Sequence, residues 1–124
     1  MGKRRVLIVE DHADLRRLYA IGLNQRGFEV RVATNGAEAI DRIEESTPHV
    51  LVLDLCMPLM DGWEVIDRIS ASSTPDIPVV VVSGYKQPED RTIPPTIRGW
   101  LTKPATIEEL ARTIESVSPL ANAS

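Results

Sequence analysis

Residues 50–54 of the 124-residue chain read Val-Leu-Val-Leu-Asp, four apolar residues that end in a carboxylate. An uninterrupted apolar run of this length is typical of a strand buried on both faces, as in a parallel sheet covered by helices. Burying the carboxylate of Asp54 at the end of such a strand is costly without a partner. The run therefore predicts a parallel sheet covered by helices. It also predicts that other charged groups lie near Asp54.

Similar runs occur before and after this stretch. Residues 6–9 and 79–82 are continuously apolar, and a weaker run surrounds Trp100 and Leu101. Residues 28–32 alternate between apolar and polar, which indicates a half-exposed strand at the edge of the sheet. With helical patterns between the runs, the sequence predicts an α/β domain with a parallel sheet and helices on both faces.

Helix starts are predicted from capping residues that are followed three positions later by an acidic residue. The pairs are Asn35 with Glu38, Asp61 with Glu64, and Thr106 with Glu109, the last being a strict capping box. An earlier helix, with Leu15, Leu18, Tyr19 and Leu23 at helical spacing, ends at Gly27. Between residues 86 and 96, Pro94 and Pro95 stop any helix that Pro88 could open, so a stub or a loop is expected.

Composition limits the possible functions. A length of 124 residues suits one domain, and 18 acidic against 14 basic residues give a net charge of −4, the wrong sign for binding nucleic acid. No apolar run approaches the length of a membrane span or a signal peptide, so we expect no membrane contact and a cytoplasmic location. A single cysteine with two histidines cannot form an internal disulfide or a zinc cage.

Chemically useful side chains follow the predicted strands. Glu10 and Asp11 follow the first run, Asp54 the middle one, Ser83 the next, and Lys103 the last. Ligands of an open parallel sheet bind beyond the carboxyl ends of its strands, so these groups are expected to converge. Clustered carboxylates favour a hard cation such as Mg²⁺, and an ammonium with a hydroxyl suits a phosphoryl group. In the simplest alternative, Asp11 caps a helix that begins near Asp14.

The chain resembles the receiver domains of two-component response regulators, in the stand-alone, single-domain form similar to the chemotaxis response regulator. The resemblance implies a flavodoxin-like, doubly wound sheet of five parallel strands in the order 2-1-3-4-5. The matching stretches are Val-Leu-Ile-Val-Glu-Asp at 6–11, Leu-Asp-Leu-Cys-Met-Pro-Leu-Met-Asp-Gly at 53–62, Ser-Gly at 83–84 and Trp-Leu-Thr-Lys-Pro at 100–104.

This resemblance implies a role for each matching residue. Asp54 is expected to be the phosphoacceptor, attacking the phosphohistidine of a sensor histidine kinase or a histidine phosphotransfer protein. Mg²⁺ is expected to be the cofactor. Its implied ligands are Glu10, Asp11, Asp54 and the main-chain carbonyl of Cys56.

Other matching residues are expected to contact the phosphoryl group or to respond to it. Lys103 pairs with its oxygens and Ser83 donates a hydrogen bond to it, which lets Trp100, at the switch aromatic position, turn inward. A cis peptide joins Lys103 to Pro104, which proline makes tolerable. The family usually carries a full fourth helix between Ser83 and Trp100, where this chain has a short, proline-containing segment, so its output surface is expected to differ.

The predicted module is a signalling phosphoacceptor, not an enzyme beyond its own phosphorylation and dephosphorylation. Residues 1–118 form the expected receiver domain, and residues 119–124 a frayed end. Its output is expected to be a surface offered to a downstream protein, with phosphorylation-dependent dimerisation as a further option. Alternatively, the chain is a receiver fragment of a larger response regulator or hybrid kinase.

Three alternative functions are weaker. A haloacid dehalogenase-type phosphatase also uses a strand-end aspartate with Mg²⁺, but it carries a second aspartate two residues later, where this chain has Cys56. A flavin or nucleotide binder of this fold would need glycines one residue apart, and the chain has none. A degenerate receiver that acts as a scaffold is disfavoured because all five chemical positions carry competent residues.

Overall fold

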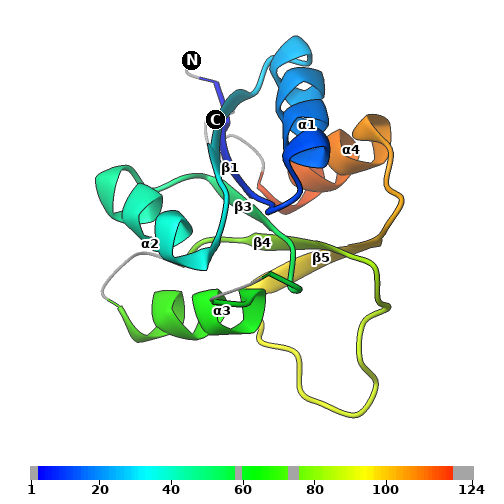
Figure 1. Ribbon diagram of the computed structural model, residues 1–124. Helices are drawn as coiled ribbons and strands as arrows, with labels where there is room; N and C mark the ends of the chain where they lie inside the picture. Colours follow the sequence, from blue (N-terminus) through cyan, green and yellow to red (C-terminus); the bar gives the residue numbers. More distant parts are fainter. Residues whose placement is uncertain (1–2, 58–59, 73–75, 119–124) are drawn as a thin grey trace.

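The computed structural model describes residues 3–57, 60–72 and 76–118, which form one parallel sheet with helices on both faces (Figure 1). The sheet order is β2-β1-β3-β4-β5. The strands are β1 (Arg5–Val9), β2 (Glu29–Ala33), β3 (Val50–Leu53), β4 (Val79–Ser83) and β5 (Ile97–Thr102). The helices are α1 (Ala13–Gln25), α2 (Gly36–Glu45), α3 (Gly62–Ala71) and α4 (Ile107–Val117).

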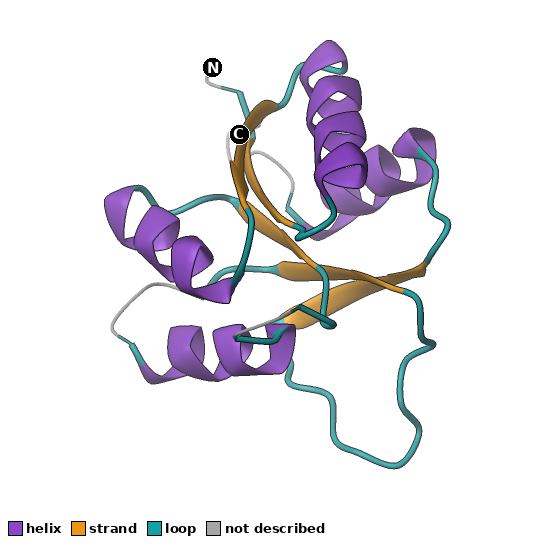
Figure 2. Ribbon diagram, viewed as in Figure 1, coloured by secondary structure: helices purple, strands orange, loops and turns teal. Residues whose placement is uncertain are grey.

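Side chains of the strands alternate between two cores, one on each face of the sheet. Leu51 and Leu53 of β3 pack with α2 and α3, whereas Val50 and Val52 pack with α1 and α4. Figure 2 shows these two helix pairs on opposite sides of the sheet. The four residues of β3 are at most 2% exposed, as the continuous apolar run predicts.

The predicted fold class, strand order and parallel pairing are confirmed. The edge strand β2 lies one residue later than the predicted 28–32, and β5 is longer than the weak run around Trp100 indicated. Residues 84–96 form a connection with no helix, which confirms the expected loop. The predicted frayed end, 119–124, lies outside the described residues.

Local signals place the helix starts. Asn35, Asp61 and Thr106 each accept a hydrogen bond from the main-chain N–H three residues later, as predicted, and Thr106 with Glu109 completes the capping box.

Helix α1 departs from expectation at two points. Its N-cap is His12, whose Nδ1 accepts a hydrogen bond from the N–H of Leu15 at 3.4 Å, so capping does not account for Asp11. The apolar stripe of the helix contains Tyr19 and Leu23 but omits Leu18, which is 56% exposed because it lies on the outward face. Among the described residues, no helix is both long enough and apolar enough to cross a membrane.

Candidate functional site

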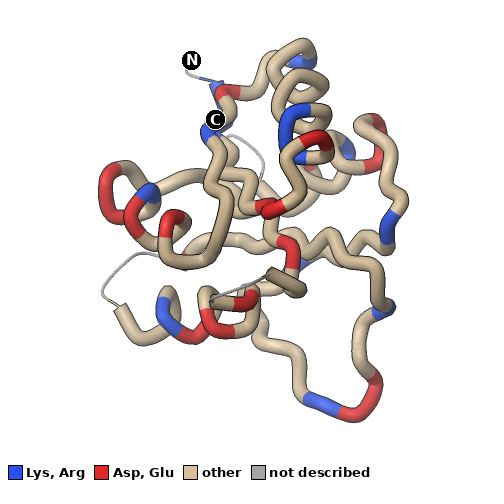
Figure 3. The backbone as a smooth tube through the Cα atoms, in the orientation of Figure 1, with Lys and Arg blue, Asp and Glu red and all other residues tan. Residues whose placement is uncertain are grey.

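Two neighbouring strands bring the carboxylates together. Glu10 follows β1 and Asp54 follows β3, and these strands pair in parallel with Val9 opposite Leu53. Glu10 is 2% and Asp54 5% exposed, while Asp11 is exposed. Carboxylate oxygens of all three lie within 4.8 Å of one another. Figure 3 marks the acidic positions of the described chain in red and the basic positions in blue along the backbone.

Lys103 reaches this cluster from the end of β5. Its main-chain N–H donates to the carbonyl of Ser83 at 2.7 Å, and the Lys103–Pro104 peptide bond is cis. Its Nζ lies 3.0 Å from Glu10 Oε1 and 3.2 Å from Asp54 Oδ2. One ammonium thus bridges two buried carboxylates that come from other strands.

Main-chain amides bind the remaining carboxylate oxygens. The N–H of Cys56 donates to Asp54 Oδ1 at 3.0 Å, and the N–H of His12 donates to Glu10 Oε2 at 3.2 Å. Every carboxylate oxygen of Glu10 and Asp54 therefore has a donor, which compensates for its removal from water. Cys56 is an exposed residue that contributes its main-chain amide to the site.

The charges in the site influence one another. Burial raises the pKa of Glu10, and the neighbouring charge of Asp54 raises it further, against the lowering effect of Lys103. For Lys103, burial lowers the pKa, but the hydrogen bond to Glu10 and the charges of Glu10 and Asp54 outweigh burial and raise it. Lys103 is therefore a protonated cation at neutral pH, held between the carboxylates of Glu10 and Asp54.

The donor set fits a hard divalent cation. Carboxylate oxygens are the protein ligands that Mg²⁺ prefers, usually one or two of them together with waters and phosphate oxygens. Glu10, Asp11 and Asp54 offer such oxygens from two adjacent strand ends, within one small volume. An added cation there would also reduce the repulsion among the three carboxylates.

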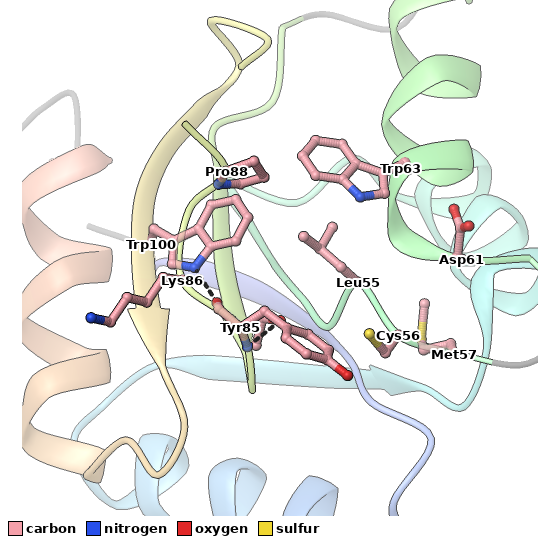
Figure 4. A pocket seen from close by; sticks show the side chains of 10 residues that line it. Leu55, Cys56, Met57, Asp61, Trp63, Tyr85, Lys86, Pro88 and Trp100 are labelled. Carbon is pink, nitrogen blue, oxygen red and sulfur yellow. Dashed lines mark hydrogen bonds between the residues drawn. The ribbon is translucent and has the colours of Figure 1, made fainter. Parts of the chain in front are cut away.

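Ser83 and Trp100 lie beside the cluster and are linked to each other. Ser83 ends β4, which pairs with β3, and is 1% exposed. Its Oγ accepts a hydrogen bond from the N–H of Tyr85 at 3.2 Å. The carbonyl of Tyr85 accepts a hydrogen bond from Trp100 Nε1 at 2.9 Å (Figure 4). The main chain of Tyr85 thus connects the hydroxyl to the aromatic ring.

The sequence did not predict that the main chain of Tyr85 links Ser83 to Trp100. Nor did it identify the amides of Cys56 and His12 as donors to the carboxylates. All three residues act through main-chain groups, which every residue carries, so their side chains give no signal in the sequence.

Comparison with known protein families matches residues 6–115 to the response regulator receiver domain, so the chain belongs to that family. It is a receiver domain of the response regulator class, with the five-stranded fold seen in structures of chemotaxis response regulators. The relatives compared below are a transcriptional regulatory protein, a chemotaxis response regulator and the receiver domain of a hybrid histidine kinase.

Transcriptional regulatory protein PrrA of Mycobacterium tuberculosis is 35% identical over 115 residues, which cover 91% of this chain and 49% of PrrA. The chain therefore spans about half the length of PrrA. The structure of chemotaxis response regulator CheY4 of Vibrio cholerae is 27% identical with a TM-score of 0.83, covering 94% of this chain and 99% of that one. The receiver domain of hybrid histidine kinase CckA is 32% identical with a TM-score of 0.76, covering 90% and 96%.

Proposed function

We propose that Asp54 accepts a phosphoryl group from the phosphohistidine of a sensor histidine kinase or a histidine phosphotransfer protein. A carboxylate oxygen of Asp54 forms the new P–O bond while the P–N bond to the donor imidazole breaks, and the imidazole leaves with the electron pair. The product is an acyl phosphate on the aspartate. Membership of the receiver family and the position of Asp54 at the end of the central strand β3 support this assignment.

Lys103 and Ser83 stabilise the transferred group. The ammonium of Lys103, 3.2 Å from Asp54 Oδ2, supplies positive charge where the phosphoryl oxygens gather negative charge. The hydroxyl of Ser83 uses its oxygen to accept from Tyr85, so its hydrogen is available to donate to a phosphoryl oxygen.

The acidic cluster would hold Mg²⁺, with Glu10, Asp11, Asp54 and the main-chain carbonyl of Cys56 as its proposed ligands. When bound, the ion supplies charge neutralisation for the phosphoryl oxygens. Asp11 is the most exposed of the three carboxylates and has no part in capping α1, so it can turn toward the ion.

Residues 1–118 form the proposed receiver module. Its proposed output is a surface that a downstream protein binds. Trp100 is the proposed reporter of phosphorylation because its indole is joined to Ser83 through Tyr85. PrrA and CckA illustrate the larger regulators in which such a module occurs. The chain's own catalysis is confined to its phosphorylation and dephosphorylation.

The observation that carries the proposal is the bridge of Lys103 between Glu10 and Asp54, two carboxylates buried at adjacent strand ends. Incubation with acetyl phosphate and Mg²⁺, followed by intact mass spectrometry, tests it. One phosphoryl group per chain is expected, and omission of Mg²⁺ or addition of EDTA should prevent the modification.

Asp54→Asn is the matched variant because asparagine keeps the shape of the side chain but cannot form an acyl phosphate. It should remain unmodified under the same conditions. A modification of the same extent in this variant would refute the assignment of Asp54.

A further inference from the structure

One buried hydroxyl in the described part of the chain has no hydrogen-bond partner. It belongs to Tyr19 of α1, a residue that is 1% exposed. A buried phenol without a partner is costly, because burial removes the water that would otherwise bind it. Phenylalanine would fill the same apolar space without this cost, so packing alone does not explain the hydroxyl.

The direction of α1 brings this hydroxyl toward the acidic cluster. The helix follows β1 and leads to the start of the parallel strand β2, so it begins at the carboxyl edge of the sheet and runs away from it. Helical side chains lean toward the start of their helix, and the side chain of Tyr19 therefore leans back toward that edge. It packs in the same core as Ile8 and Val52, which stand two positions before Glu10 and Asp54.

The pleat of the sheet puts the charged groups on the same face as Tyr19. The main-chain N–H groups of Glu10 and Asp54 still pair with the neighbouring strands, at 3.1 Å each, so side chains continue to alternate up to these residues. Leu101 also packs in this core, which puts Lys103, two positions later, on that face. Burial raises the pKa of the Tyr19 hydroxyl, and the charges of all three groups act on it as well.

Glu10 depends on a donor that the proposed reaction diverts. Its Oε2 accepts from the N–H of His12, and its Oε1 is bound by the ammonium of Lys103 at 3.0 Å. Lys103 is also the cation assigned to the phosphoryl oxygens in the proposed function. Because Glu10 is 2% exposed, water cannot easily replace the ammonium at Oε1. The hydroxyl of Tyr19 is an unpartnered donor on the same face of the sheet.

We propose that Tyr19 is a positioning residue whose hydroxyl donates to Glu10 once the ammonium of Lys103 turns to the phosphoryl group. This inference rests on the proposed function of Asp54. In the unphosphorylated chain Lys103 binds Glu10, and the hydroxyl has no partner. After transfer, the phenol O–H and the carboxylate satisfy each other, and a hydrogen bond to an ionised acceptor is among the stronger ones. Tyr19 thereby favours the phosphorylated arrangement.

A double-mutant cycle tests this contact without any phosphoryl group. Lys103→Ala removes the ammonium from Glu10, so in this background the hydroxyl of Tyr19 should already bind the carboxylate. Tyr19→Phe should therefore lower the Tm of Lys103→Ala. In the wild-type background the same substitution removes an unpartnered hydroxyl, and the Tm should stay equal or rise.

Lys3→Ala, at an exposed lysine, provides the control background for this cycle. There Tyr19→Phe should change the Tm as it does in the wild type. If Tyr19→Phe shifted the Tm equally in the wild type and in Lys103→Ala, the hydroxyl would act in packing alone, and the proposal would be overturned.

Binding of beryllofluoride in the presence of Mg²⁺ is a second measurement, which remains informative if Lys103→Ala does not fold. Calorimetric titration of the full chain should show about tenfold weaker binding in Tyr19→Phe than in the wild type, because only the phosphorylated arrangement uses the hydroxyl. An unchanged affinity, alongside normal binding by the wild type, would overturn the role of Tyr19 and leave the proposed function standing. Absence of binding in the wild type would instead refute the proposed function, and the phosphorylation-dependent role of Tyr19 with it.

Discussion

At the scale of single residues, Lys103 links the two buried carboxylates of the site. Its ammonium contacts both Glu10 and Asp54, so it balances buried negative charge before phosphorylation and would contact the phosphoryl oxygens afterwards. The proposed nucleophilic oxygen, by contrast, belongs to Asp54. Loss of the lysine should therefore affect the response to phosphorylation more than the transfer itself.

Lys103→Ala is expected to accept the phosphoryl group on Asp54 but to lose the Trp100 fluorescence response. The measurement combines intact mass with fluorescence on one sample treated with acetyl phosphate and Mg²⁺. Lys3→Ala, at an exposed lysine, is the control and should behave as the wild type. A full fluorescence response in Lys103→Ala would contradict the role given to the lysine.

Gly62 allows α3 to lie close to the main chain of Asp54 and Leu55. A Cβ at this position would lie 2.8 Å from the carbonyl oxygen of Asp54 and 2.7 Å from Leu55 Cδ2. The main-chain oxygen cannot yield as a flexible side chain would, so the helix or the loop must shift.

Gly62→Ala should lower the free energy of unfolding by about 1–3 kcal/mol, as overpacking of a core does, and should slow the phosphorylation of Asp54. Gly84→Ala is the matched control, because a Cβ there would meet no atom within 4 Å. Urea denaturation measures both variants. Equal stability of the two would show that the close approach at Gly62 is unimportant.

At the scale of elements, local signals in the sequence predicted three helix starts because a cap depends on residues only three positions apart. The start of α1 was predicted less well. Asp11 carries the side chain expected of a cap, yet His12 is the cap, since the carboxylate of Asp11 belongs to the acidic cluster. A tertiary arrangement decided that choice.

The β4–β5 connection shows the same limit. Its prolines predicted the absence of a helix, which the structure confirms. They could not predict that Arg91 contacts Trp63, because these residues are 28 positions apart and no periodic pattern relates them. Contacts of this kind depend on the completed sheet.

The start of β3 carries a titratable contact that makes stability depend on pH. His49 Nδ1 accepts a hydrogen bond from the N–H of Arg5 at 2.8 Å, which requires that nitrogen to be unprotonated. Burial, with the nearby charges of Arg5 and Arg4, lowers the pKa of His49 below its ordinary value. The unfolded chain therefore binds a proton more readily than the folded one.

The contribution of His49 to stability should be complete above pH of about 6.5 and should be lost as the pH falls below that value. The side-chain oxygen of Asn in His49→Asn can still accept the hydrogen bond. The Tm of this variant should therefore fall less steeply than that of the wild type between pH 7 and 5. His12→Asn is the control for the other histidine. Parallel Tm curves for His49→Asn and the wild type would contradict this account.

At the scale of the whole molecule, the fold gathers negative charge at one edge of the sheet. Within the described part of the chain, Lys103 is the cation within ion-pairing distance of Glu10 and Asp54. The sequence predicted that these charged groups converge because they follow strands, and the carboxyl ends of parallel strands lie on the same side of the sheet. The main-chain donors of the site were not predictable in this way, as no side chain marks them.

If the proposed site holds Mg²⁺, the ion should raise the Tm of the whole domain, because the unfolded chain disperses the three carboxylates. At about 100 times its Kd, the ion would add roughly 2.7 kcal/mol of stability. Asp11→Asn should show a smaller rise in Tm, and Asp41→Asn, at an exposed position on α2, a normal one. If Mg²⁺ raised the Tm of Asp11→Asn as much as that of the wild type, the ion would have to bind elsewhere.

The most direct test of the account is to locate the phosphoryl group. The chain is incubated with acetyl phosphate and Mg²⁺ and then treated with borohydride, which reduces an aspartyl phosphate to homoserine, and its peptides are sequenced by mass spectrometry. Homoserine is expected at position 54 alone. Homoserine at position 11, or none at position 54 in a chain that has gained the phosphoryl mass, would contradict it.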